Sequence, residues 1–146
     1  MARRPPDTQT PDLFEVPQPA APNPASMDYR TQVSALTSEL LRLAGHDRYE
    51  ISAQVSRLSG KEVSKFMLDA YCSEAREEFN LPFWMVPALE SVASSHLLTN
   101  WLVGVRGGRL LVGRDALHAE LGRLEKEIDD RTQIRSELLK RMGERS

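Results

Sequence analysis

Lysine and serine side chains that suit contact with a nucleic acid gather around Gly60, between residues 48 and 71. Lys61 and Lys65 are one helical turn apart, so both would share a face and neutralise phosphates. The hydroxyls of Ser59 and Ser64 can bond phosphate oxygens or base edges. These types and spacings predict a surface that binds double-stranded DNA. The candidate residues here are Arg48, Arg57, Ser59, Lys61, Ser64 and Lys65.

Two short helices, separated at Ser59-Gly60, would position these side chains. The first would bury Ile51, Val55 and Leu58 and offer the small Ala53 for close contact. The second, about Lys61–Tyr71, would act as the recognition helix and enter the major groove by its N-terminal turn. It would bury Val63, Phe66 or Met67, and Ala70, and leave Lys61, Glu62, Ser64, Lys65 and Asp69 outward. The alternative is a bundle in which these two helices merely pack together.

Two further arginines, Arg106 and Arg109, flank the pair Gly107-Gly108. A Gly-Gly pair between apolar residues predicts a two-residue β-hairpin. Its basic tip would resemble the wing of a winged helix, which inserts arginine into the minor groove. The other interpretation is a short hairpin that only connects two helices.

The segment with Ile51, Ala53, the break at Gly60 and then Val63-Ser64-Lys65 resembles the helix-turn-helix of lambda-repressor-like phage regulators. The later Leu81-Pro82-Phe-Trp-Met-Val-Pro-Ala-Leu89, followed by His96-Leu-Leu98-Thr-Asn-Trp101-Leu102, is similar to the last two helices of CII-type regulators. It also resembles small early-region proteins of Mu-like transposable phages. The resemblance covers about residues 28–104. It implies a helical DNA-binding fold and a regulatory role in a phage or prophage.

The last segment, residues 114–146, predicts one long oligomerising helix. Apolar residues recur there in steps of four and three, which is the a/d pattern of a coiled coil. The seam residues are Leu117, Leu121, Leu124, Ile128 and Leu138, with Arg131 and Arg135 in the same register. We expect a homodimer or a higher oligomer. The alternative is a helix folded back on its own domain.

Seven of the nine prolines fall in residues 1–27, which predicts a disordered, partly polyproline-like arm. Within it, the stretch Gln9–Phe14 faintly resembles the peptides that bind sliding clamps. This is one candidate contact with a partner. The other interpretation is a plain tail.

Composition narrows the classes of function. The formal net charge is −2, which argues against a wholly basic coat for nucleic acid. The single Cys72 forms no internal disulfide and suits a reducing compartment, and the three histidines form no metal-binding pair. We therefore expect no enzyme, no cofactor and no metal, and a cytoplasmic protein without a membrane segment.

The predicted fold is all-α: a disordered arm over 1–27, a helix-turn-helix-type bundle of about five short helices over 28–104, a small β-hairpin or linker over 105–113, and a coiled-coil helix over 114–146. The leading hypothesis is a DNA-binding regulator. The alternative is a helical adaptor that binds proteins and no nucleic acid. The surface charge around Lys61, Lys65 and Arg57 separates the two hypotheses.

Overall fold

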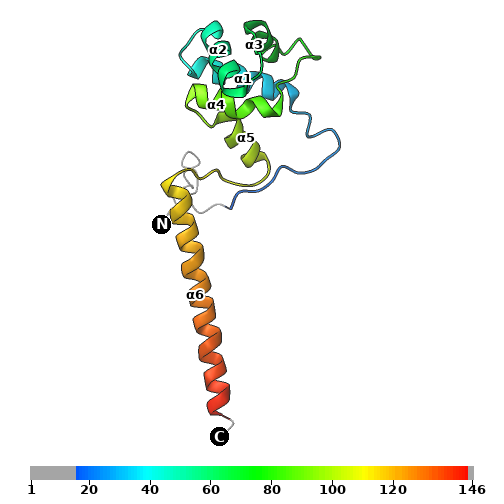
Figure 1. Ribbon diagram of the computed structural model, residues 1–146. Helices are drawn as coiled ribbons and strands as arrows, with labels where there is room; N and C mark the ends of the chain where they lie inside the picture. Colours follow the sequence, from blue (N-terminus) through cyan, green and yellow to red (C-terminus); the bar gives the residue numbers. More distant parts are fainter. Residues whose placement is uncertain (1–15, 145–146) are drawn as a thin grey trace, which may run out of the picture. The chain divides into compact units, whose positions relative to one another are not determined.

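The computed structural model describes residues 16–144 of the 146-residue chain. Its helices are α1 (Arg30–Leu43), α2 (Arg48–Ser59), α3 (Lys65–Tyr71), the 3-10 turn η1 (Phe83–Met85), α4 (Val86–Ala93), α5 (Leu97–Val105) and α6 (Arg114–Gly143). The chain divides into two compact units, Met1–Leu110 and Leu111–Ser146. In Figure 1, α1 to α5 gather into one bundle, the helical body, while α6 is a single helix. The all-α prediction is confirmed.

Short-range capping signals begin and end the helices of the body. The Asp47 carboxylate accepts a hydrogen bond from the Glu50 amide at 2.9 Å and begins α2. Gly60 ends α2 in the left-handed conformation, with φ 68°. The Ser64 hydroxyl then accepts from the Met67 amide at 3.1 Å and begins α3. The predicted break at Gly60 is thus confirmed, but the second helix begins at Lys65, so Lys61–Ser64 form the turn that precedes it.

The core of the body lies where α4 packs against both α1 and α2. Leu40, Ile51, Val55, Leu68, Met85 and Leu89 are at most 1% exposed. Burial of Ile51, Val55, Val63 and Ala70 was predicted correctly. The prediction was wrong for Leu58, which is 53% exposed, and for Ala53, which faces solvent. Of the two alternatives Phe66 and Met67, Met67 packs partly buried against the core and Phe66 is 57% exposed.

The buried faces of α2 and α3 explain these errors. Ser52, and not Ala53, is the small buried residue of α2. Since α3 begins at Lys65, its buried residues are Leu68, Ala70 and Tyr71, and the two large ones, Leu68 and Tyr71, lie three positions apart. Phe66 then points outward, where its ring contacts Phe79 edge-to-face at 6.0 Å.

The β-hairpin predicted around Gly107-Gly108 is wrong, and no strand occurs within residues 16–144. Val103 and Val105 belong to the last turn of α5. The Gly108 amide donates to the Val103 carbonyl at 2.8 Å, and the Gly107 amide donates to the Gly104 carbonyl at 3.0 Å. Together with the positive φ of Gly107, 76°, this is a Schellman motif. The glycine pair therefore ends a helix and does not turn a hairpin.

Part of the predicted arm lies against the end of α5. The Ala20 amide donates to the Val105 carbonyl at 2.9 Å, and Pro19 forms an isolated bridge with Arg106. Just after the arm, at the start of α1, Tyr29 packs edge-to-face on Trp101 with 5.3 Å between the ring centroids. Residues 1–15, with the candidate peptide Gln9–Phe14, lie outside the described residues.

The loop between α3 and η1 is held by one side chain, Arg30. Its guanidinium donates to four backbone carbonyls, at Ser73, Glu74, Arg76 and Glu77. The bond to Glu74 is 2.9 Å long. A planar fork with five donors suits such a cluster of acceptors, so this loop keeps its shape without regular structure.

The second unit contains α6, a helix of 30 residues with no buried residue. All five predicted seam residues lie on it, with exposed fractions from 42% for Leu124 to 72% for Leu117. None of the helices within residues 16–144 is both long and apolar enough to cross a lipid bilayer.

Candidate nucleic-acid interface

The turn between α2 and α3 fixes how α3 is presented. The Ser56 hydroxyl accepts a hydrogen bond from the Val63 amide at 2.9 Å and lies 2.7 Å from the Ser52 carbonyl oxygen, to which it donates. Val63 itself is buried beneath the turn. Lys61 and Glu62, at the tip, are exposed. A side chain of α2 therefore ties the turn down, and α3 lies on the body with one open face.

Three charged groups meet on that open face. The Asp69 carboxylate binds Lys65 at 2.6 Å and Arg48 at 2.5 Å. The hydrogen bond from Lys65 is the main cause that lowers the pKa of Asp69, and the hydrogen bond from Arg48 lowers it further. In turn, Asp69 raises the pKa of Lys65. Two of the six predicted contact residues around Gly60 therefore share a carboxylate partner.

Aromatic rings lie under two of the lysines. The ammonium group of Lys61 lies 5.3 Å from the centroid of the Trp84 ring, and that of Lys65 lies 5.5 Å from the Tyr49 ring. Trp84 and Tyr49 are 45% and 69% exposed. These two rings were not among the predicted residues of the site. Trp84 belongs to η1, 23 residues after Lys61, and Tyr49 belongs to the first turn of α2, 16 residues before Lys65.

Of the remaining predicted contact residues, the two serines form hydrogen bonds within the protein, while Arg57 and Lys61 form no ion pair among residues 16–144. Ser64 uses its hydroxyl to cap α3, and the Ser59 hydroxyl accepts from the Lys61 amide at 3.3 Å. Arg57 is exposed and, like Lys61, makes no ion pair with any residue between 16 and 144. Arg57 and Lys61 are therefore the cations of the turn whose charge no neighbouring carboxylate matches.

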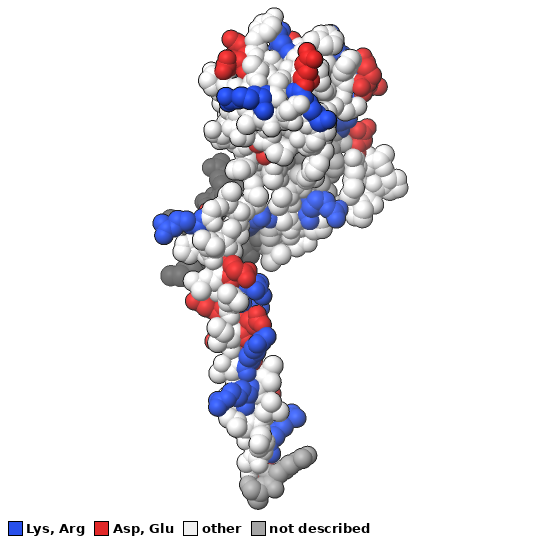
Figure 2. Space-filling view, in the orientation of Figure 1, with Lys and Arg blue, Asp and Glu red and all other residues white. Residues whose placement is uncertain are grey.

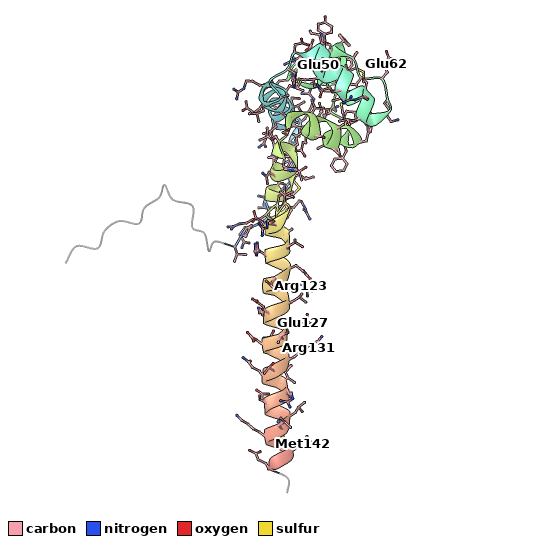
Figure 3. The ribbon with its side chains drawn as sticks, turned by 60° about the vertical axis from the view of Figure 1, so that its left-hand side comes forward. Glu50, Glu62, Arg123, Glu127, Arg131 and Met142 are labelled. Atoms are coloured by element: carbon pink, nitrogen blue, oxygen red, sulfur yellow. The ribbon has the colours of Figure 1, made fainter. Side chains whose placement is uncertain are left out.

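Acidic side chains accompany these cations. Residues 47–78 contain five Lys and Arg against seven Asp and Glu. Figure 2 shows the two signs interspersed on the visible face of the body, without one broad positive field. Glu50, on α2, and Glu62, at the turn, are both labelled on this part of the body in Figure 3. Any duplex bound here would meet local cations within a mixed surface.

Arg106 and Arg109 lie at and beyond the C-terminal end of α5, and both are exposed. Because the hairpin is absent from the described residues, these arginines do not form the tip of a wing. They follow a helix end beside Pro19.

One thiol and several His, Asp and Glu side chains are the other groups of the described residues that could take part in chemistry. Cys72 is half-buried, and burial raises the pKa of its thiol, which disfavours the nucleophilic thiolate. Residues 16–144 contain no group of three His, Cys, Asp or Glu side chains that could hold a metal ion. Comparison with protein families, with characterised proteins and with solved structures gives no match.

Proposed function

We propose that the helical body is a helix-turn-helix module that binds double-stranded DNA through the turn at Gly60 and the open face of α3. In this proposal the protein is a regulator of the phage or prophage type, and α6 joins copies so that more than one module engages the same duplex. The proposal assigns no catalytic residue and no cofactor.

The observation that carries the proposal is the fixed presentation of α3. Ser56 holds the turn, Leu68 and Tyr71 anchor the helix on the body, and the opposite face of α3 is open. Arg57, on α2, and Lys61, in the turn before α3, are exposed and make no ion pair among residues 16–144. The Lys65–Asp69 pair is partly exposed, and such pairs are held weakly in water, so a phosphate could compete with Asp69 for Lys65.

The experiment is a titration of a fluorescent duplex with the full chain at two salt concentrations. If each module contacts roughly three phosphates, the affinity per bound module should fall about 40-fold between 50 and 200 mM salt, and the fall is squared when two joined modules engage one duplex. Lys61→Gln should weaken binding several-fold and reduce the salt slope by about one. Lys126→Gln, an exposed lysine on α6, is the matched control and should leave the affinity within twofold. Absence of binding at 50 mM salt would overturn the proposal.

A second candidate function is a protein adaptor, which the excess of acids over bases in residues 47–78 favours. A groove of about 330 Å³ adds to it, with an apolar lining that includes Val33, Val86, Leu98 and Trp101. Phe83, at 77% exposure, lies on the lining of the same groove. The duplex titration separates the two functions, because an adaptor of this charge would not bind the duplex at either salt concentration.

A further inference from the structure

An apolar stripe runs along α6 and faces water. Positions that step by four and three carry six apolar side chains, all between 42% and 72% exposed. These are Leu117, Leu121, Leu124, Ile128, Leu138 and Met142, and the same register places Arg131 and Arg135 between Ile128 and Leu138. A regular stripe of this kind fits the matching stripe of a second helix.

We propose that this stripe binds α6 of a second copy of the chain in the antiparallel orientation, with Leu121 opposite Leu138 of the second copy. This inference rests on the self-association put forward above, and it adds a direction and a register. The two arginines on the stripe decide the direction.

A parallel pair in register would place like charges together. Arg131 would face Arg131 of the second copy in the centre of the seam, and Arg135 would face its own counterpart. The flanking positions would bring Glu120 against Glu125 of the second copy, twice in each dimer. Because the seam excludes water, such contacts between like charges are costly.

The antiparallel pair replaces each of these contacts. Arg131 then lies opposite Ile128 of the second copy, and Arg135 lies opposite Leu124. The apolar stem of an arginine can cover an aliphatic side chain while its guanidinium stays in water. Arg131 is also matched within its own helix, because its guanidinium bonds Glu127 at 2.6 Å. Figure 3 labels Arg123, Glu127 and Arg131 in succession along α6.

Charge complementarity on the flank supports the same orientation. With Leu121 opposite Leu138, Glu120 comes beside Arg141 of the second copy. Arg141 is exposed and makes no ion pair among residues 16–144, so its charge is available. Glu120 bonds Arg123 of its own helix at 2.7 Å, which leaves an exposed carboxylate that can accept a second cation.

The register follows from the two neighbouring antiparallel alternatives. A shift of one heptad in one direction brings Glu127 against Glu127 of the second copy. A shift in the other direction brings Arg135 opposite Arg131. The first of these shifts also gives both arginines aliphatic neighbours, but it leaves Leu138 and Met142 without a stripe residue opposite them. Only the full overlap avoids both like-charge contacts and places all six apolar positions opposite the stripe of the second copy.

Cysteine cross-linking of the full chain tests the direction. In a Cys72→Ser background, a mixture of Leu117→Cys and Met142→Cys chains should form the mixed disulfide on mild oxidation, while neither variant alone should form a disulfide dimer. If each variant alone forms the disulfide dimer, the pair is parallel and the orientation proposed here is wrong. A monomeric mass by light scattering, without any cross-link, would overturn self-association itself. The two failures are therefore distinguishable.

Charge exchange tests the register. Arg141→Glu should weaken the dimer roughly 10-fold, because two exposed ion pairs are lost and two repulsions replace them. Adding Glu120→Arg to Arg141→Glu should restore most of the affinity. Lys140→Glu is the matched control, since residue 140 lies on the outer face of the pair. Equal weakening by Arg141→Glu and Lys140→Glu, or failure of the restoration, would refute the assigned register.

Discussion

The buried carboxylate of Glu90, which lies on α4, caps the N-terminal turn of the next helix, α5. Glu90 is 6% exposed and accepts hydrogen bonds from the Thr99 amide at 2.8 Å and the Thr99 hydroxyl at 2.6 Å. Thr99 is in the first turn of α5, where the N-cap residue His96 makes no side-chain capping bond. The Ser95 hydroxyl accepts from the Leu97 amide at 3.3 Å, and Glu90 adds a cap on the Thr99 amide that also joins α4 to α5.

Replacement of Glu90 by alanine should lower the free energy of unfolding of the helical body by about 3 kcal/mol. Two hydrogen bonds to a charged acceptor contribute roughly 1.5–3 kcal/mol each, and removal of a carboxylate from a buried site recovers part of that sum. Thr99→Val removes only the hydroxyl and should cost about 1–1.5 kcal/mol. Because both substitutions remove the same bond, the double variant should cost less than the sum of the two.

Urea titration followed by tryptophan fluorescence measures these changes. Trp84 and Trp101 both belong to the first unit, and Trp101 is on α5, so the signal reports the body and not α6. Glu125→Ala, an exposed glutamate of α6, is the control and should leave the midpoint unchanged. A loss below about 0.5 kcal/mol for Glu90→Ala would refute the capping role, because that is the range of ordinary surface substitutions.

Two further predictions concern the other contacts of the body. The pKa of Asp69 is lowered by Lys65 and then by Arg48, so the stabilisation from its charge is complete above the ordinary pKa, near pH 4, and is lost as the pH falls through the lowered pKa. Between pH 5 and pH 2.5, the free energy of unfolding of the wild type should fall by about 0.5–1 kcal/mol more than that of Asp69→Asn. The difference is small because the side chains of the cluster are about one-third exposed. Parallel curves of unfolding free energy against pH for the two proteins would contradict this prediction. Gly107 has φ 76°, and a Cβ there would lie 2.5 Å from the Pro19 nitrogen, so Gly107→Ala should speed hydrogen exchange of the Ala20 amide at least tenfold. Gly122→Ala, which meets nothing within 4 Å, should leave that exchange unchanged, and unaltered protection in Gly107→Ala would show that the contact tolerates a side chain.

The features of the fold that were predictable from the sequence act within one helical turn. Asp47 and Gly60 cap α2 through bonds to residues three or four positions away, so their types and spacing were sufficient. The bonds from Arg30 to the 73–77 loop span more than 40 positions, and no local pattern announces them. Gly107-Gly108 misled because a glycine pair suits both a hairpin turn and a Schellman helix end, and only the helical context of Val103 decides between them.

In the candidate interface, too, local contacts were predictable from the sequence and contacts between distant elements were not. The spacing of Lys61 and Lys65 placed both lysines on one helix, whereas Lys61 lies in the turn and only Lys65 belongs to α3. The Lys65–Asp69 pair, four positions apart on one helix, is the kind of contact that spacing can reveal. Arg48, at the start of α2, also pairs with Asp69, and this contact depends on how α2 and α3 pack together. The partnership of Lys61 with Trp84 depends on the packing of η1 in the same way.

The exposure of the apolar stripe on α6 links the folding of this helix to the concentration of the protein. A helix of 30 residues with a largely polar surface and no buried residue is only marginally ordered in water while it is unpaired. Pairing between chains follows mass action, so a low protein concentration favours unpaired, partly unfolded α6 helices and a high concentration favours paired ones. We therefore expect the helical content of the protein in solution to rise with its concentration, so that the number of copies a cell makes sets how much of the tail is ordered.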